Sequence, residues 1–307
     1  MVLEVFRSRK TTIALLLALL PLIIVESRER SVPGYIFIGF AVPLVLNLVL
    51  CLFDHIRKSG KFTPKRIGFI TFHASFLVII TGGIITYYTY TVGYIELAEG
   101  QGFRDYKGNY TAWQQKFDTR KDTGVYIVIR KIMLEFWKNG QIKEFRNEVL
   151  IKDGDRGKNE TLNVNGSLKY GDLLINMSRF YGLAPYFTLI TPHGNTSGYV
   201  NIKNEMKFNS FEIPMAGYRA HVSYKDINDK QINIKIFLDG KTLEREMKKG
   251  DTIDLGKSSL ELTDIRIWNG LTVVTDSGKQ ITYTGFVLFL AGLALYYGSK
   301  FSGSQGK

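Results

Sequence analysis

Cysteine is nearly absent from this 307-residue sequence, which contains only Cys51. An internal disulfide needs two cysteines, so the chain has no disulfide framework, no C-x-x-C redox pair and no C-x-x-C-H segment for covalent haem attachment. Cys51 lies inside an apolar run, and we interpret it as a small packing residue. The chain therefore neither exchanges disulfides by itself nor carries covalently attached haem.

Histidine is also scarce, and no two histidines have the spacing of a metal site. His193 lies in a turn-like TPHGN segment and His221 in a strand-like RAHVSY segment, and we interpret both as structural or solvated. His55 follows an apolar run and is most simply an interfacial residue, with a contact to haem or lipid left open. Because a phosphate-binding glycine loop, a nucleophile elbow and a catalytic carboxylate pair are all missing, the sequence predicts no catalytic residue.

Charge is missing from four long apolar runs, three near the N-terminus and one near the C-terminus. They are Thr11–Val25, Tyr35–Phe53, Ile67–Val92 and Ile281–Gly298. The first is short for a membrane span and contains Pro21, so a signal peptide is its competing interpretation, although no small-residue cleavage pattern follows it. Runs of this length cross a bilayer core of about 30 Å. We predict a membrane protein with four transmembrane α-helices.

The net charge of +12 does not indicate a nucleic-acid partner. Residues 93–280 hold 28 Lys and Arg against 24 Asp and Glu, whereas the remainder holds 12 against 4. The excess positive charge thus flanks the apolar runs. By the positive-inside rule, both termini and the loop after Phe53 face the cytoplasm and the long insert faces outward. This pattern predicts a multi-pass protein of the cytoplasmic (inner) membrane, in contact with lipid.

The insert has the pattern of an all-β domain. Alternating runs rich in β-branched and aromatic residues recur at Val125–Glu135, Gln231–Leu238, Ser259–Trp268 and Leu271–Thr275. Polar turns are expected between them at Lys152–Asn159, Asp239-Gly240 and Asn269-Gly270. Short strands at this spacing indicate a sandwich or partly closed barrel. We therefore expect three parts: a membrane part over 1–92, an external β-rich domain over 93–280, and a last helix with a short cytoplasmic tail over 281–307.

His73 is the one ionisable residue inside the run Ile67–Val92. It lies roughly 10 Å along the helix from Arg66, at about 1.5 Å per residue. Ionisable residues inside a membrane indicate function by default, and neutral imidazole is a common ligand of haem iron. A histidine hydrogen-bonded to a neighbouring helix, with a partner such as Thr71 or Ser75, is the other interpretation. From the residues alone the two carry equal weight.

Four short segments resemble the ResB (CcsB) family of System II cytochrome c biogenesis proteins. Gly93–Gln101 is similar to the family's G-Y-x-x-L-x-E-G segment, and Leu162–Gly171 to its V-N-x-P-L-x-Y-G stretch. Tyr181–Pro185 and Gly270–Gly278 follow in the family's order. Ser167 and Ser277 stand where proline is usual, which indicates a divergent member. The resemblance covers nearly the whole chain.

The resemblance implies a subunit that helps carry haem across the membrane and present it to apocytochrome c. It implies that His73 is an axial ligand of the iron of haem in transit, with the second ligand supplied by a partner. That partner would be a ResC/CcsA-type membrane subunit with a tryptophan-rich external motif, which this chain lacks. The subunit itself would be non-catalytic or co-catalytic in a holocytochrome c synthase complex.

Two other classes stay open from the sequence. One is a membrane-tethered protein whose β-domain binds or senses a ligand and whose His73 is purely structural. The other is a haem-bearing electron-transfer subunit, although such proteins usually place paired histidines on their own helices.

Overall fold

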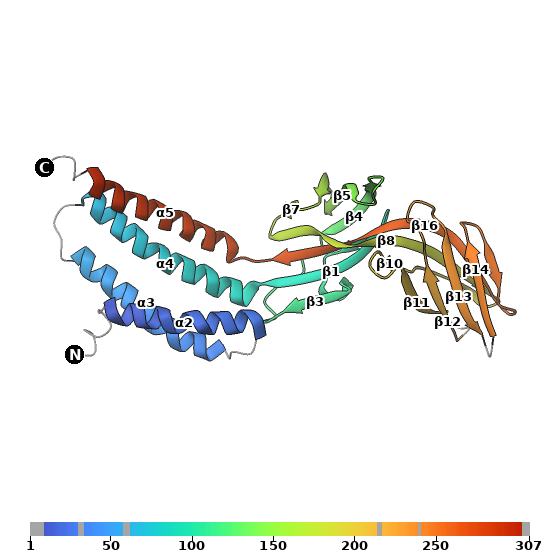
Figure 1. Ribbon diagram of the computed structural model, residues 1–307, viewed down its shortest axis with the longest axis horizontal. Coiled ribbons are helices and arrows are strands. Elements are labelled where there is room, and N and C mark those ends of the chain that lie inside the picture. The colour runs from blue at the N-terminus through green and yellow to red at the C-terminus, as the bar shows by residue number, and fades with distance from the viewer. Residues whose placement is uncertain (1–8, 30–33, 58–61, 214–216, 239–240, 303–307) are drawn as a thin grey trace. The chain divides into compact units, whose positions relative to one another are not determined.

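The computed structural model describes residues 9–29, 34–57, 62–213, 217–238 and 241–302 (Figure 1). Contacts divide the chain into two units. The helical unit comprises Met1–Thr89 together with Ser277–Lys307, and the β-domain comprises Tyr90–Asp276. The first unit is therefore built from both ends of the sequence, and the second is a single continuous segment.

Four helices form the described part of the helical unit: α2 (Arg9–Glu29), α3 (Gly34–Arg57), α4 (Pro64–Thr89) and α5 (Lys279–Ser302). Three of them are long and apolar enough to cross a membrane, over Gly39–Arg57, Pro64–Thr89 and Lys279–Ser299. The apolar stretch of α2, Lys10–Leu22, is shorter. Three apolar helices thus agree with a membrane protein, and the count of four spans stays a prediction.

Helix α4 ends earlier than the hydropathy of the sequence predicts. The expected span ran to Val92, but the helix stops at Thr89 and strand β1 begins at Thr91. Thr91 and Val92 pair with Thr275 and Val274 of strand β16. Apolar β-branched residues suit a membrane helix and a strand equally well, so composition alone placed this boundary three residues too late.

Helices α4 and α5 lie side by side and touch through small residues that recur every seven positions (Figure 1). These residues are Gly68, Ser75 and Gly82 on α4, Gly285 and Gly292 on α5, and Gly278 just before α5. A Cβ atom added at Gly68 would overlap the backbone of Tyr296, and one added at Gly292 would overlap the backbone of Phe72. The two backbones are therefore in direct contact, as in small-residue packing of membrane helices.

The β-domain contains three antiparallel sheets. Sheet A joins β1 (Thr91–Ala98), β3 (Ala112–Gln115), β7 (Ser167–Tyr170), β8 (Leu173–Thr191), β9 (Gly194–Tyr199), β10 (Ile202–Lys203), β15 (Thr252–Asp254) and β16 (Ser259–Thr275). Sheet B has the order β2 (Gly102–Arg104), β4 (Tyr126–Phe136), β5 (Ile142–Asp153), β6 (Arg156–Asn163). Sheet C has the order β11 (Phe208–Ile213), β12 (Tyr218–Ser223), β13 (Ile232–Leu238), β14 (Lys241–Met247). The described part of this unit is therefore β-rich.

Two hydrophobic cores lie along sheet A because its central strands, β8 and β16, are 19 and 17 residues long (Figure 1). The first core packs one end of these strands against sheet B and includes Ile175, Leu271 and Ile127. The second packs the other end against sheet C and includes Leu189 and Ile234. A single paired ribbon of two strands thus supports two layered lobes.

One of the turns expected from the sequence lies inside a strand. Asn269-Gly270 does not end a strand, because β16 continues through it with a shift in register. The Asn269 side chain is fully buried, where it accepts a hydrogen bond from Asn147 and donates to the carbonyl oxygens of Ser178 and Phe180. These bonds replace those of a turn. The turn expected within Lys152–Asn159 is confirmed at Gly154-Asp155, between β5 and β6, whose ends pair over the rest of that range. Asp239-Gly240 lies outside the described residues.

A buried ion pair lies beside the first core, next to its residue Tyr110. The side chain of Asp105 is inaccessible to solvent and that of Arg120 is 4% exposed. Arg120 Nη2 lies 2.5 Å from Asp105 Oδ1, and Tyr110 and Thr123 donate to the same carboxylate at 2.5 and 2.6 Å. Burial alone raises the pKa of Asp105, but the hydrogen bonds from Thr123, Tyr110 and Arg120 outweigh it and leave the pKa below its usual value.

We expect Gly68→Ala and Gly292→Ala to destabilise the helical unit by about 1–3 kcal/mol, because the added methyl groups meet backbone that cannot move aside. Thermal aggregation of the detergent-solubilised protein measures this effect. Gly83→Ala and Gly298→Ala are matched controls, since nothing lies within 4 Å of a Cβ at either position. The controls should be neutral or slightly stabilising. Equal effects in both pairs would contradict close packing of α4 on α5.

We expect Asp105→Asn to lower the free energy of unfolding of the β-domain by about 3–5 kcal/mol at pH 7, because Arg120 then loses its buried counter-charge. Since the pKa of Asp105 is lowered by folding, its contribution is full above the unfolded pKa of about 3.9 and disappears as the pH falls through the folded value. The variant should therefore approach the parent protein in strong acid. Denaturation followed by tryptophan fluorescence measures the free energy of unfolding at pH 7 and in acid, because all three tryptophans lie in residues 90–276. The exposed Asp118, paired with Lys107, gives the control Asp118→Asn, in which little change is expected.

Candidate functional site

His73 is placed by a helix whose first turn is well defined. Pro64 is the first residue of α4, where a missing N–H has no consequence. Thr63 caps the helix: its carbonyl accepts from the Ile67 N–H at 2.9 Å and its hydroxyl from the Arg66 N–H at 3.3 Å. His73 follows nine residues after Pro64, roughly 14 Å along the axis at about 1.5 Å per residue. The imidazole therefore lies well inside an apolar helix, as the sequence predicts.

One nitrogen of His73 is already used. Nδ1 lies 2.9 Å from the carbonyl oxygen of Phe69, one turn earlier on the same helix. A carbonyl oxygen only accepts, so Nδ1 carries the proton and donates it, and Nε2 keeps its lone pair. No described residue bonds to Nε2, and the side chain is partly exposed. His73 thus presents the tautomer that coordinates a metal through Nε2.

Aromatic rings surround this imidazole. The ring of Phe69 lies 3.8 Å from the His73 ring, centroid to centroid, and that of Phe72 lies 5.2 Å away in an edge-on arrangement. Phe72 also packs on Phe289 of α5 at 5.0 Å. The surroundings of His73 are consequently flat, apolar and polarizable, without an acidic partner among the described residues.

A second histidine lies against the same phenylalanine. The His55 ring, near the end of α3, is 4.1 Å from the Phe69 ring. Arg66 of α4 holds this end of α3 in place, because its Nη2 donates to the carbonyl oxygens of His55 and Ile56 at 3.3 and 2.8 Å. Helix C-termini leave such carbonyls without partners, and a buried guanidinium satisfies them. Sequence reasoning treated His55 as interfacial and ended the apolar run at Phe53, whereas α3 continues to Arg57.

The remaining candidates do not join this cluster. The Ser75 hydroxyl donates to the Phe72 carbonyl at 2.6 Å rather than bonding to His73. His193 lies in the exposed turn between β8 and β9, and His221 lies on β12 with its ring 4.8 Å from that of Phe237. Among the described residues no three His, Cys, Asp or Glu side chains come together to hold a metal. The helical unit therefore contains the only close approach of two histidines in the described part of the chain.

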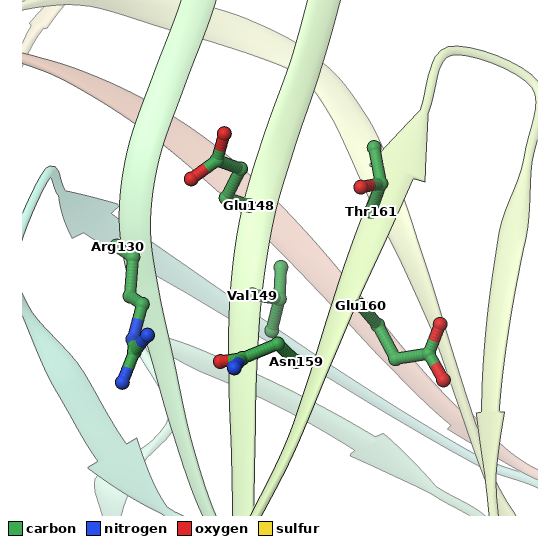
Figure 2. A pocket seen from close by; sticks show the side chains of 6 residues that line it. All are labelled: Arg130, Glu148, Val149, Asn159, Glu160 and Thr161. Atoms are coloured by element: carbon green, nitrogen blue, oxygen red, sulfur yellow. The ribbon is translucent and has the colours of Figure 1, made fainter.

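A hollow of about 490 Å³ lies on sheet B (Figure 2). Arg130 of β4 lines it with Glu148 and Val149 of β5 and Asn159, Glu160 and Thr161 of β6. Figure 2 shows the carboxylates of Glu148 and Glu160 pointing away from each other. Because they do not converge on one point, they do not form a general acid and base pair.

Two glycines in the segments that carry the family resemblance, Gly182 and Gly100, have structural tasks in the β-domain. The Trp268 Nε1 donates to the Ile202 carbonyl at 3.0 Å, and a Cβ at Gly182 would overlap that same carbonyl. Gly100 has a φ of +85°, which favours glycine, and Arg266 Nη1 donates to the carbonyl of Glu99 at 2.7 Å. These residues hold the middle of sheet A, and none of them offers a metal ligand.

The chemistry available to the chain is therefore that of a neutral imidazole in an apolar, aromatic site. Such a group coordinates haem iron through one nitrogen while the other is oriented by a hydrogen bond to a carbonyl. The Nδ1 bond of His73 and the rings of Phe69 and Phe72 are compatible with a porphyrin ligand.

Comparison with known proteins identifies the family. The ResB-like family matches residues 58–298, which include α4, the whole β-domain and most of α5. The chain belongs to the ResB-like family. His73 lies within the matched residues, and His55 lies three residues before them.

Two curated relatives have informative names. The protein is 23% identical over 243 residues to "Cytochrome c biogenesis protein CcsB" of Picosynechococcus sp. (strain ATCC 27264 / PCC 7002 / PR-6), with 76% of this chain and 50% of that protein covered. It is 24% identical over 269 residues to "Cytochrome c biogenesis protein Ccs1" of Rhodomonas salina, with 82% of this chain and 58% of that protein covered. The chain thus spans about half the length of these relatives. Family and apolar helices together indicate a membrane protein.

Proposed function

We propose that this chain is the ResB-type subunit of a cytochrome c biogenesis complex that carries haem across the membrane and presents it to apocytochrome c. The names of the two curated relatives support the pathway. Haem is the cargo in this proposal and is bound only in transit. In this proposal the subunit binds and positions haem rather than performing the thioether chemistry.

The observation that carries the proposal is the state of His73. Its Nδ1 proton is fixed on the Phe69 carbonyl, its Nε2 lone pair is available, and it lies deep within an apolar helix. Histidine in that setting is costly to keep unless it has a task. An axial bond to haem iron is the task that suits a neutral imidazole among aromatic rings.

The charges at the same end of α4 support the direction of entry. Haem carries two carboxylates, and the exposed Lys65 lies in the first turn of the helix that holds His73. With the excess of Lys and Arg at this end taken as cytoplasmic, haem enters from the cytoplasmic side and the β-domain faces outward. We propose that a ResC/CcsA-type membrane subunit accepts the haem and that the β-domain docks this partner or the apocytochrome.

The proposed orientation predicts opposite signals from two reporter fusions. A reporter placed after Lys61 should show activity typical of the cytoplasm, and one placed after Gln280 should show activity typical of the outside. Ten Lys and Arg in the predicted cytoplasmic segments, against Glu4 and Asp54, are the physical reason. Paired alkaline phosphatase and fluorescent-protein fusions measure it, and matching signals at the two sites would contradict the orientation.

His73→Ala should abolish haem binding and cytochrome c maturation while the protein stays in the membrane. Alanine keeps the span apolar, so insertion is preserved and only one iron ligand is lost. External imidazole should restore part of the activity, because it supplies the same donor atom to the vacancy. Covalent haem on a reporter cytochrome, in cells lacking the native subunit, measures maturation with and without imidazole.

The matched control is His193→Ala, which removes an exposed histidine of the β-domain and should change nothing. Normal maturation by His73→Ala at normal protein level would return His73 to a structural role. The same result would favour the membrane-tethered binding protein as the function. Haem in the purified parent protein, seen as a Soret band that the variant lacks, separates the two functions directly.

A further inference from the structure

Three side chains of α4 lie four residues apart and form one stripe on the helix surface: Lys65, Phe69 and His73. Residues at this spacing are neighbours on the same face of a helix. The stripe begins with an exposed cation in the first turn, continues with the phenylalanine whose ring lies 3.8 Å from the His73 ring, and ends at the imidazole. It therefore changes from charged to apolar over roughly 12 Å, at about 1.5 Å per residue.

Helix α5 holds the charged end of this stripe. A Cβ at Gly68 would overlap the backbone of Tyr296, so that part of α5 lies directly against α4. The Tyr296 ring lies 6.5 Å from the Phe69 ring, and the Lys65 Nζ lies 5.8 Å from the centre of the Tyr296 ring. A cation over the face of an aromatic ring is attracted to it. The ammonium group of Lys65 is therefore held at the α5 side of the stripe.

Lys65 and its neighbour Arg66 have different tasks. The Arg66 side chain is buried and donates to the carbonyl oxygens of His55 and Ile56, so its guanidinium serves the end of α3. The Lys65 side chain is exposed, and no carboxylate among the described residues pairs with it. Lys65 is thus the cation of this turn that can pair with an anion from outside the chain.

Haem has the same change of polarity as this stripe. Its iron lies at the centre of an apolar ring, and its two carboxylates lie on one edge. Burying a carboxylate without a partner is costly, and α4 has no Asp, Glu, Lys or Arg after Arg66. With the iron at His73, the carboxylate edge is therefore more stable toward Lys65 than toward the apolar remainder of the helix.

We propose that Lys65 binds a propionate carboxylate of the haem whose iron is bound by His73, and that this pair lets the chain distinguish haem from a neutral iron porphyrin. The inference rests on the proposed function and deepens it, because it names a residue that determines specificity for the cargo. A haem carboxylate rather than a lipid phosphate is the assigned partner, since Lys65 shares its stripe with His73.

Titration of the purified full-length protein with haem and with haem dimethyl ester tests this assignment, in neutral detergent without lipid. The ester has the same iron and ring but no carboxylate. Lys65→Gln should bind haem about fivefold more weakly than the parent protein does, which corresponds to one exposed ion pair. It should bind the ester as tightly as the parent protein. Lys65→Arg keeps the charge and should match the parent protein with both compounds.

The matched control is Lys279→Gln. Lys279 is also an exposed lysine in the first turn of a helix, and its Nζ also lies 5.8 Å from the centre of a tyrosine ring, that of Tyr283. It belongs to the other end of the helix pair, so its loss should leave both affinities unchanged. Equal weakening of haem and ester binding by Lys65→Gln overturns the assignment, as does parental affinity for both. An effect of Lys65→Gln that appears only after anionic lipid is added assigns Lys65 to lipid headgroups and also overturns it.

Failure of this inference is distinguishable from failure of the proposed function. If His73→Ala loses haem while Lys65→Gln binds haem as the parent protein does, His73 remains the ligand and only the Lys65 assignment fails. If the parent protein binds no haem, or His73→Ala binds it as the parent protein does, the proposed function fails and the Lys65 assignment fails with it.

Discussion

The close approach of α4 and α5 is the contact on which the helical unit depends. Small residues recur every seven positions on both helices, and a Cβ at Gly68, Gly285 or Gly292 would meet neighbouring backbone. In a membrane no hydrophobic force drives two apolar helices together, so packing area and backbone contacts have to do so. At the end of the α4 and α5 pair, the Ser277 N–H donates to the Thr89 hydroxyl at 3.3 Å. This bond joins the end of α4 to the residue two before the start of α5. A helix from each end of the sequence is thereby held as one pair.

Packing on one face of α4 leaves its other residues for the histidine cluster. Gly68 and Ser75 face α5, whereas Phe69 and His73 lie with His55 of α3. Helix α3 is linked to α4 by a guanidinium, because Arg66 donates to the carbonyl oxygens of His55 and Ile56. Helix α4 therefore packs closely on α5 with one face and carries the histidine cluster toward α3, which under the proposed function is the side that binds haem.

Sequence alone predicted the apolar helices, the β-rich insert and the position of His73 inside an apolar helix, because each is a local signal of length, alternation or isolated charge. The family was predicted from four short motifs in order. Sequence alone did not predict the cluster around His73, since His55 and Phe69 are 14 residues apart and meet only when α3 packs on α4. It also misplaced Asn269-Gly270, where a dipeptide typical of turns is buried inside β16. The partner of Asn269 is Asn147, 122 residues away, so no local pattern could reveal that the turn signal is overruled.

The way His73 is held is suited to a ligand that is later released. Metal-ligating histidines donate their other ring N–H to a carboxylate, a backbone carbonyl or water, and a carboxylate raises the basicity of the imidazole the most. His73 instead donates to the Phe69 carbonyl, a neutral acceptor that also lies in the hydrogen-bond ladder of its own helix. Neutral hydrogen bonds are about half as strong as those to charged groups, so the imidazole is oriented without being made strongly basic. Under the proposed function, that difference lets His73 select the iron and yet give it up to the next ligand.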